Sequence, residues 1–235
     1  MIIKPCIALA LMIAAAPAAA DQRDFSVTSF TRIRIEGPIK VTIATGGSPK
    51  AEARGDRRAI DRIRIETSGD LLSVGIDRTN WTGESDQTDD GRAEVLIGAQ
   101  SIESLSIIGA GDVAVNAARS TRFRLVLTGP GKVAIKAMDV TQLTATINGN
   151  GMAQLAGHAV QARIASQGSG AIDATALDSE DADVTLIGAG EIKLKARRTA
   201  HATLKGSGRI LISGSPACTM VREGSGELTC GSHAQ

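Results

Sequence analysis

Seven Gly-x-Gly triplets recur at a near-constant interval through the second half of this 235-residue chain, and they limit the fold more than any other feature. A lone triplet is a weak indication of a phosphate-binding loop, and that interpretation needs a strand before it and a helix after it. Steps of 18 to 20 residues instead indicate a recurring structural turn, in which glycine supplies backbone angles that other residues avoid. The paired glycines are Gly109 and Gly111, Gly129 and Gly131, Gly149 and Gly151, Gly168 and Gly170, Gly188 and Gly190, Gly206 and Gly208, and Gly224 and Gly226.

The residues on either side of each triplet alternate between apolar and polar types. Counted from the first glycine, positions −4, −2, +4 and +6 are apolar in all but two of 28 cases, the exceptions being Ser166 and Arg222. The interleaved positions after the bend are mostly polar. This two-residue period predicts a strand on each side of the bend, because an amphipathic helix would need a period of about 3.6 residues.

The repeat therefore predicts an all-β fold, a β-helix-like parallel β-solenoid with turns of about 20 residues. Equivalent strands of successive turns would pair in parallel ~4.8 Å apart, so that like side chains stack in columns inside the coil. The composition agrees, because 43% of the residues are hydrophobic and only 2% aromatic, which leaves Val, Ile, Leu and Ala to fill the core. We expect a right-handed coil, since parallel crossovers are usually right-handed.

The N-terminus has the pattern of a secretory signal peptide over residues 1–20. Lys4 supplies a positive charge, an apolar run follows, and Ala18–Ala20 offers a cleavage site before Asp21. The mature chain would then carry 25 basic and 25 acidic residues and no transmembrane segment. This balance gives no electrostatic basis for binding nucleic acid, so we expect an exported protein of the periplasm, the cell surface or the extracellular space.

Cys218 and Cys230 are the only cysteines that would remain after cleavage. A pair of cysteines in an oxidising compartment favours a disulfide over a metal site or a catalytic thiol. The two residues lie six positions either side of Gly224, in the last turn, where Arg222 also replaces an apolar residue. The sequence thus predicts a disulfide-closed cap at the C-terminal end of the solenoid, which spans residues 101–235.

Residues 21–100 lack the glycine period but keep strand patterns, for example over residues 32–36, 39–43, 62–66 and 71–76. We expect an N-terminal β section here, either the start of the same β-structure or a small packed subdomain. A polar, acidic stretch over residues 79–92 predicts a surface loop. Within it, Asp86, Thr88 and Asp90 imitate the first half of a calcium-binding loop. Ile97 stands where a closing bidentate Glu is needed, so a solvated acidic loop is the favoured interpretation.

The remaining polar residues form no catalytic constellation in the sequence. His158, His201 and His233 are scattered, which favours surface histidines. A stripe of arginines could hold an acidic glycan if its strands were neighbours, although a solvated face paired with Glu36 and Glu66 is the favoured interpretation. The stripe comprises Arg32, Arg34, Arg62 and Arg64.

Two segments together resemble the putative auto-transporter adhesin head GIN-domain family. The first is Phe30–Gly37 followed by Val41–Ile43, and the second is Leu71–Ile76 followed by Leu105–Val113. The resemblance covers roughly residues 28–215. It implies a β-helix-like fold, export to the bacterial envelope and an adhesive or scaffold role, and it offers no agreed catalytic residues.

We therefore expect a non-enzymatic protein without cofactors that binds an envelope component, a glycan or another protein. A β-helix enzyme acting on polysaccharide is the first alternative, but such enzymes use long loops and aromatic residues around a groove, and the repeats have neither. An accessory factor in envelope assembly or stress is the second alternative.

Overall fold

The computed structural model describes residues 21–77 and 93–231. These residues form a 17-stranded sheet and one short helix, α1 (Arg57–Asp61). The N-terminal strands are β1 (Asp21–Phe25), β2 (Arg32–Glu36), β3 (Lys40–Thr45), β4 (Lys50–Gly55), β5 (Ile63–Ser68), β6 (Leu71–Ile76) and β7 (Ala93–Ala99). The strands of the repeat region are β8 (Ser104–Ile108), β9 (Asp112–Val115), β10 (Ala118–Thr128), β11 (Lys132–Gly149), β12 (Met152–Gly168), β13 (Ala171–Gly188), β14 (Glu191–Gly206), β15 (Arg209–Gly214), β16 (Ala217–Glu223) and β17 (Glu227–Cys230).

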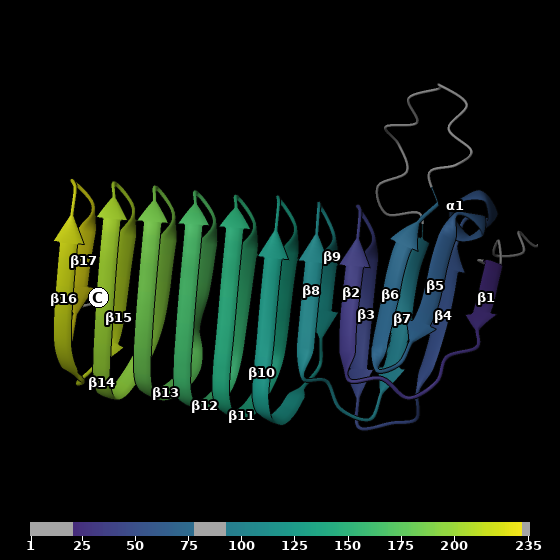
Figure 1. The fold of residues 1–235 in the computed structure, drawn as a ribbon, viewed down its shortest axis with the longest axis horizontal. Coiled ribbons are helices and arrows are strands. Elements are labelled where there is room, and N and C mark those ends of the chain that lie inside the picture. Colours follow the sequence, from purple (N-terminus) through teal and green to yellow (C-terminus); the bar gives the residue numbers. More distant parts are fainter. Residues whose placement is uncertain (1–20, 78–92, 232–235) are drawn as a thin grey trace, which may run out of the picture.

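The strands stack side by side along the long axis of the molecule and make two faces (Figure 1). We call the strand segments before each bend the pre-bend face and those after it the post-bend face. The pre-bend order is β6, β2, β8, β10, β11, β12, β13, β14 and β16, with every neighbouring pair parallel. The post-bend order is β7, β3, β9, β11, β12, β13, β14, β15 and β17, again parallel. The predicted β-solenoid is confirmed.

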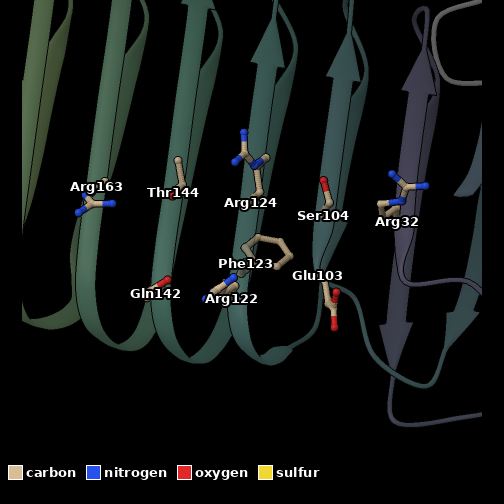
Figure 2. Close-up of a pocket in the computed structure, with 9 residues that line it drawn as sticks. All are labelled: Arg32, Glu103, Ser104, Arg122, Phe123, Arg124, Gln142, Thr144 and Arg163. Atoms are coloured by element: carbon tan, nitrogen blue, oxygen red, sulfur yellow. The ribbon is translucent and has the colours of Figure 1, made fainter. Parts of the chain in front are cut away.

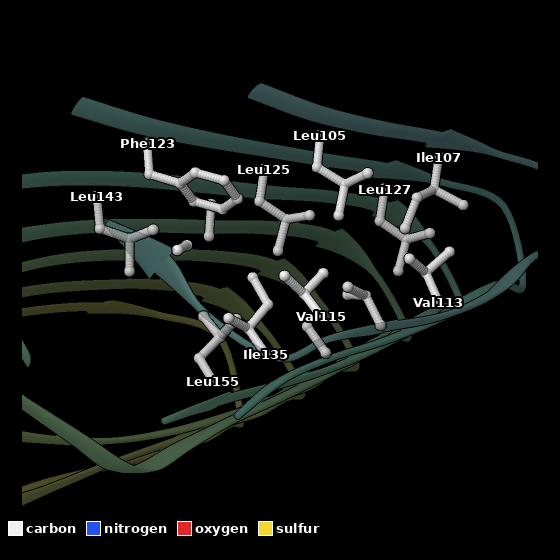
Figure 3. Close-up of a cluster of buried hydrophobic side chains, with 14 of the residues drawn as sticks. Leu105, Ile107, Val113, Val115, Phe123, Leu125, Leu127, Ile135, Leu143 and Leu155 are labelled. Carbon is white, nitrogen blue, oxygen red and sulfur yellow. The ribbon is translucent and has the colours of Figure 1, made fainter. Parts of the chain in front are cut away.

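The inner columns follow the predicted register. Val113 pairs with Val133, and the column continues through the equivalent residue of every later coil, namely Ala153, Ile172, Ile192, Ile210 and Leu228. Figure 3 shows the aliphatic side chains of neighbouring coils lying against one another inside the structure. Apart from Leu228 in the last coil, these residues are buried. Each coil therefore needs its neighbours to bury its inner face.

One of the two polar exceptions in the columns is also buried. Ser166 lies between Ile147 and Leu186 and is 2% exposed. Its hydroxyl has no hydrogen-bond partner among the described residues. A buried hydroxyl without a partner costs stability, so this coil is packed less favourably than its neighbours.

The seven glycine bends enclose about six full turns and bring successive backbones into close contact. The first glycine of every triplet has a φ between +99° and +125°. Residues with a side chain rarely adopt these angles, so the first position needs glycine. The second position needs glycine because of close contact: a Cβ on Gly190 would lie 2.4 Å from the carbonyl oxygen of Gly170 in the preceding coil. The Gly208 amide also donates to the Gly188 carbonyl oxygen at 2.9 Å. The bends stack as tightly as the strands do.

One coil of the solenoid is out of sequence order. β2 and β3 lie between β6–β7 and β8–β9, so that Ile33 pairs with both Leu72 and Leu105. Likewise, Val41 pairs with both Val95 and Val113. The strands on either side of Gly37 therefore continue the columns of the repeats, and the Gly37 amide donates to the Ile108 carbonyl oxygen at 2.9 Å.

Antiparallel strands occupy the N-terminal end of the solenoid. β5 pairs with β6, β4 pairs with β7, and β1 pairs with β4, all antiparallel. The helix α1 begins after Asp56, whose side chain accepts a hydrogen bond from the Arg58 amide at 2.9 Å. This change of strand direction interrupts the parallel stack at the end where a further coil would otherwise add.

The C-terminal end has a different closure. Cys218 in β16 and Cys230 in β17 form the predicted disulfide, with their Cα atoms 6.4 Å apart. Every residue of β16 is exposed. Arg222 lies in what would be an apolar column, and its Nη1 donates to the Gly226 carbonyl oxygen at 3.4 Å. At this open edge the disulfide holds the last coil together, and the charge of Arg222 disfavours the addition of a further coil.

Replacing Gly190 with alanine should lower the free energy of unfolding by about 1–3 kcal/mol, because the new methyl group meets the backbone of the neighbouring coil. Gly75→Ala is the matched control, since a Cβ there has nothing within 4 Å. Urea denaturation of both variants measures the difference. Equal losses of stability in the two variants would contradict the tight stacking of the bends.

Reducing the disulfide should loosen the last coil before the rest of the molecule. A cross-link over so short a loop contributes about 3 kcal/mol in the entropic model, and the residues of β16 have little packing to compensate for its loss. Hydrogen exchange should therefore accelerate in β16 and β17 of Cys218→Ser, while β12 and β13 stay protected. Unchanged exchange in β16 would show that the bond is not what holds this end.

Candidate functional site

A hollow of about 490 Å³ lies on the pre-bend face where β2, β8, β10, β11 and β12 run side by side (Figure 2). Its residues come from five successive coils, although β2 is separated from β8 by more than sixty residues of sequence. Charged and polar side chains surround the buried ring of Phe123. The lining residues are Arg32, Glu103, Ser104, Arg122, Phe123, Arg124, Gln142, Thr144 and Arg163.

Five of these residues form a straight line across the coils, which we call the arginine row. The parallel register pairs each member with the next, in the order Arg32, Ser104, Arg124, Thr144 and Arg163. Figure 2 shows them at one level on successive strands. Guanidinium groups therefore alternate with hydroxyl groups, and successive arginines are two coils, or ~10 Å, apart at the backbone.

Most of the positive charge in the hollow is available to a ligand. Arg122, Arg124 and Arg163 are exposed and make no ion pair within residues 21–77 and 93–231. Glu103 is the one acidic residue of the lining, which contains four arginines. A cluster of unpaired guanidinium groups attracts carboxylate, sulfate or phosphate and can bind each of them through two hydrogen bonds.

The fourth arginine is already engaged by a carboxylate. Arg32 donates to Asp70 at 2.5 Å, and this hydrogen bond lowers the pKa of Asp70. Both side chains are more than half exposed, so the pair is weak and an anionic ligand can compete for Arg32. At the other end of the row, the register neighbour of Arg163 on β13 is Asp183. The row of positive side chains therefore ends at Arg163.

The arginine stripe considered from the sequence has a different arrangement. β2 and β5 lie on opposite sides of β6, so they are not neighbours. Arg34 pairs with Glu36 at 2.5 Å, and Arg64 pairs with Glu66 at 3.4 Å and with Asp77 at 2.7 Å. Of the four, only Arg32 lies in the hollow, and the others belong to the paired, solvated surface that the sequence favoured.

A larger hollow of about 930 Å³ lies next to this one, bordered by Gly37, Pro38 and Gly109. Both of its carboxylates are paired, since Asp77 bonds Arg64 within the lining and Glu36 bonds Arg34, which lies outside it. The post-bend face has smaller hollows of about 330 and 350 Å³, each with one lysine and at least one aspartate in its lining. Of these hollows, the one with the arginine row contains three arginines without an ion pair among the described residues, namely Arg122, Arg124 and Arg163.

The structure gives the histidines acidic neighbours that the sequence does not reveal. His158 lies in register with Asp139 and Asp178, and His201 with Asp183. These acids are on adjacent coils, so they are about one repeat away in the sequence. No hydrogen bond joins either histidine to an acid in the described part of the chain, and no group of three or more metal-ligating side chains occurs there.

Other predicted features lie outside the described residues. They are the signal peptide over residues 1–20, His233, and the acidic segment with Asp86, Thr88 and Asp90. No helix among the described residues is long and apolar enough to cross a membrane.

The arginine row has a sequence signal of its own. Each member of the row stands five residues before a bend glycine. These residues are Arg, Ser, Arg, Thr and Arg, and the glycines, in the same order, are Gly37, Gly109, Gly129, Gly149 and Gly168. The apolar columns at other positions conceal this signal. It also becomes complete only when Gly37, which has no Gly-x-Gly triplet, is recognised as a bend glycine in the same stack.

Several solved structures share this fold. A crystal structure of a putative adhesin from Bacteroides fragilis has a TM-score of 0.81 and 23% identity, covering 91% of this chain and 97% of its own. A putative lipid binding protein from Parabacteroides distasonis has a TM-score of 0.70 and 16% identity, over 90% and 96%. A putative adhesin from Parabacteroides merdae has a TM-score of 0.67 and 17% identity over the same shares. At these identities the likeness shows the fold.

The family comparison covers most of the chain. No functionally curated protein matches the sequence. The family described as "Putative auto-transporter adhesin, head GIN domain" matches residues 29–216, which include the arginine row and all the bends but the last. The chain therefore belongs to the auto-transporter adhesin head GIN-domain family.

Proposed function

We propose that the protein is an exported, non-enzymatic binding module of the bacterial envelope, adhesin-like in its role, and that its ligand binds on the pre-bend face. The observation that carries the proposal is the exposed cluster of Arg122, Arg124 and Arg163, which have no ion-pair partner among the residues that the structure describes. Family membership and the adhesins among the structural neighbours support a binding role.

The shape of the face suits binding better than catalysis. The hollow opens on regular strands whose bends in the repeat region contain only the Gly-x-Gly residues, and no long loop of the repeat region encloses it. Its single acid, Glu103, has no second carboxylate beside it among the lining residues. Glycoside hydrolysis by the usual route uses two carboxylates, so the lining supports holding a ligand and not cleaving it.

Export is supported by the leader-like sequence over residues 1–20 and by the disulfide, which persists in oxidising compartments. Expression of the full chain in a Gram-negative host should yield a protein that begins at Asp21 and is found outside the cytoplasm. Mass spectrometry of the fractionated protein checks both points. An intact N-terminus in the cytoplasmic fraction would contradict export.

The binding surface can be tested with two charge-matched triple variants of the mature chain. The test variant carries Arg122→Gln, Arg124→Gln and Arg163→Gln, and the control carries Lys50→Gln, Arg57→Gln and Arg58→Gln at exposed sites near the N-terminal end. On an array of bacterial and host glycans and on isolated envelopes, the test variant should bind about tenfold or more weakly than wild type, because charged hydrogen bonds contribute about 1.5–3 kcal/mol each. The control should bind like wild type.

Two outcomes would contradict the proposed function. One is the absence of any retained glycan or envelope component with the wild-type chain. The other is equal binding by the test variant and the wild type, which would place the ligand elsewhere on the molecule.

A further inference from the structure

We propose that the arginine row binds a linear acidic polysaccharide that lies along the solenoid axis and carries an anionic group on every second sugar. The inference rests on the proposed function and names the ligand class of the same face. It follows from the order of the side chains in the row, from their spacing, and from the groups that end the row on either side.

The spacing comes from the coil stack. Neighbouring coils are ~4.8 Å apart, so Arg32, Arg124 and Arg163 repeat at intervals of ~10 Å along the axis. A pyranose ring in an extended chain has about the length of one coil step. Each coil can therefore meet one sugar, and an acid on alternate sugars meets an arginine each time.

The side chains between the arginines suit the neutral sugars. Ser104 and Thr144 offer hydroxyl groups, which both donate and accept hydrogen bonds as sugar hydroxyls do. Gln142 lies two residues before Thr144 on β11 and adds an amide to the lining. Arg122 precedes Arg124 by two residues on the same face of β10, so the central acidic sugar has two guanidinium groups within reach.

The two ends of the row set its length. Asp183 follows Arg163 on β13 and repels an anionic chain there. At the other end Asp70 occupies Arg32, and the ligand must displace it from an exposed pair of low stability. Five coils thus define a site for about five sugars, from β2 to β12.

The same face is poorly suited to a membrane surface. Phe123 is the one aromatic residue of the hollow, and it is 1% exposed. The large exposed apolar residues of this face are Ile108 and Ile187, which lie four residues further along their strands than the arginine row, and Met220 and Val221 of β16, which lie outside the hollow. Peripheral membrane binding needs apolar side chains that enter the lipid beside the cations, and the row provides none.

The test measures binding of the mature chain to four probes by biolayer interferometry at low and high salt. They are hyaluronan oligosaccharides, with a carboxylate on alternate sugars, polygalacturonate, with one on every sugar, a neutral cello-oligosaccharide, and phosphatidylglycerol vesicles. Hyaluronan should bind, the neutral chain should not, and polygalacturonate should bind more weakly than hyaluronan at equal length. The affinity for hyaluronan should fall as salt rises.

Three single variants make the test specific to the row. Arg124→Gln and Arg163→Gln should each weaken hyaluronan binding about tenfold, in line with the loss of one charged hydrogen-bonding group. Asp183→Asn should strengthen it, because the repulsion at the end of the site is removed. Lys132→Gln, on the post-bend face, is the control and should leave the affinity unchanged. Matched melting temperatures show that each variant is folded.

Equal binding of the acidic and neutral chains, binding only to vesicles, or wild-type affinity in Arg124→Gln would overturn the polysaccharide assignment. These results differ from failure of the proposed function itself. In that case the charge-matched triple variants would not differ on any glycan or envelope component. If the triple variant loses binding to a ligand that is none of the four probes, the proposed function stands and this ligand class is refuted.

Discussion

The stacking of each coil on the next is the interaction on which the rest of this structure depends. A single coil has two short strands and cannot bury its own inner face, so the inward-facing apolar side chains need the same positions of the neighbouring coils to cover them. The glycine bends make this possible, because a side chain at Gly190 would meet the backbone below it. The two ends of the stack are closed differently. Antiparallel strands β1, β4 and β5 close the N-terminal end, and a disulfide together with Arg222 closes the C-terminal end at β16 and β17.

The repeat region could be predicted from the sequence because its signal is periodic and local. The apolar columns and the bends follow from spacing, and the disulfide follows from the two remaining cysteines and the expected export. The position of β2 and β3 could not be predicted in this way, because Gly37 has no second glycine and the coil is inserted between β6–β7 and β8–β9. A periodic pattern relates only coils that follow one another in the sequence, so it does not reveal that β2 and β3 pair with strands distant in the chain.

The candidate site depends on that insertion, which is why the sequence indicated it only in part. The sequence groups Arg32 with Arg34, Arg62 and Arg64, but Arg34 and Arg64 bond carboxylates of their own surface. The partners of Arg32 across the coils, Arg124 and Arg163, come together with it only in the stack. A regular coil spacing therefore turns a fixed position in the repeat into an evenly spaced row of surface groups.

A crystal structure of the mature chain with an acidic oligosaccharide bound tests this account most directly, because it shows both the stack and the ligand. The account predicts electron density for the sugar chain parallel to the solenoid axis, with acid groups at Arg124 and Arg163 and a neutral sugar over Thr144. A chain that crosses the coils at an angle, or that binds away from β10 and β12, would contradict it.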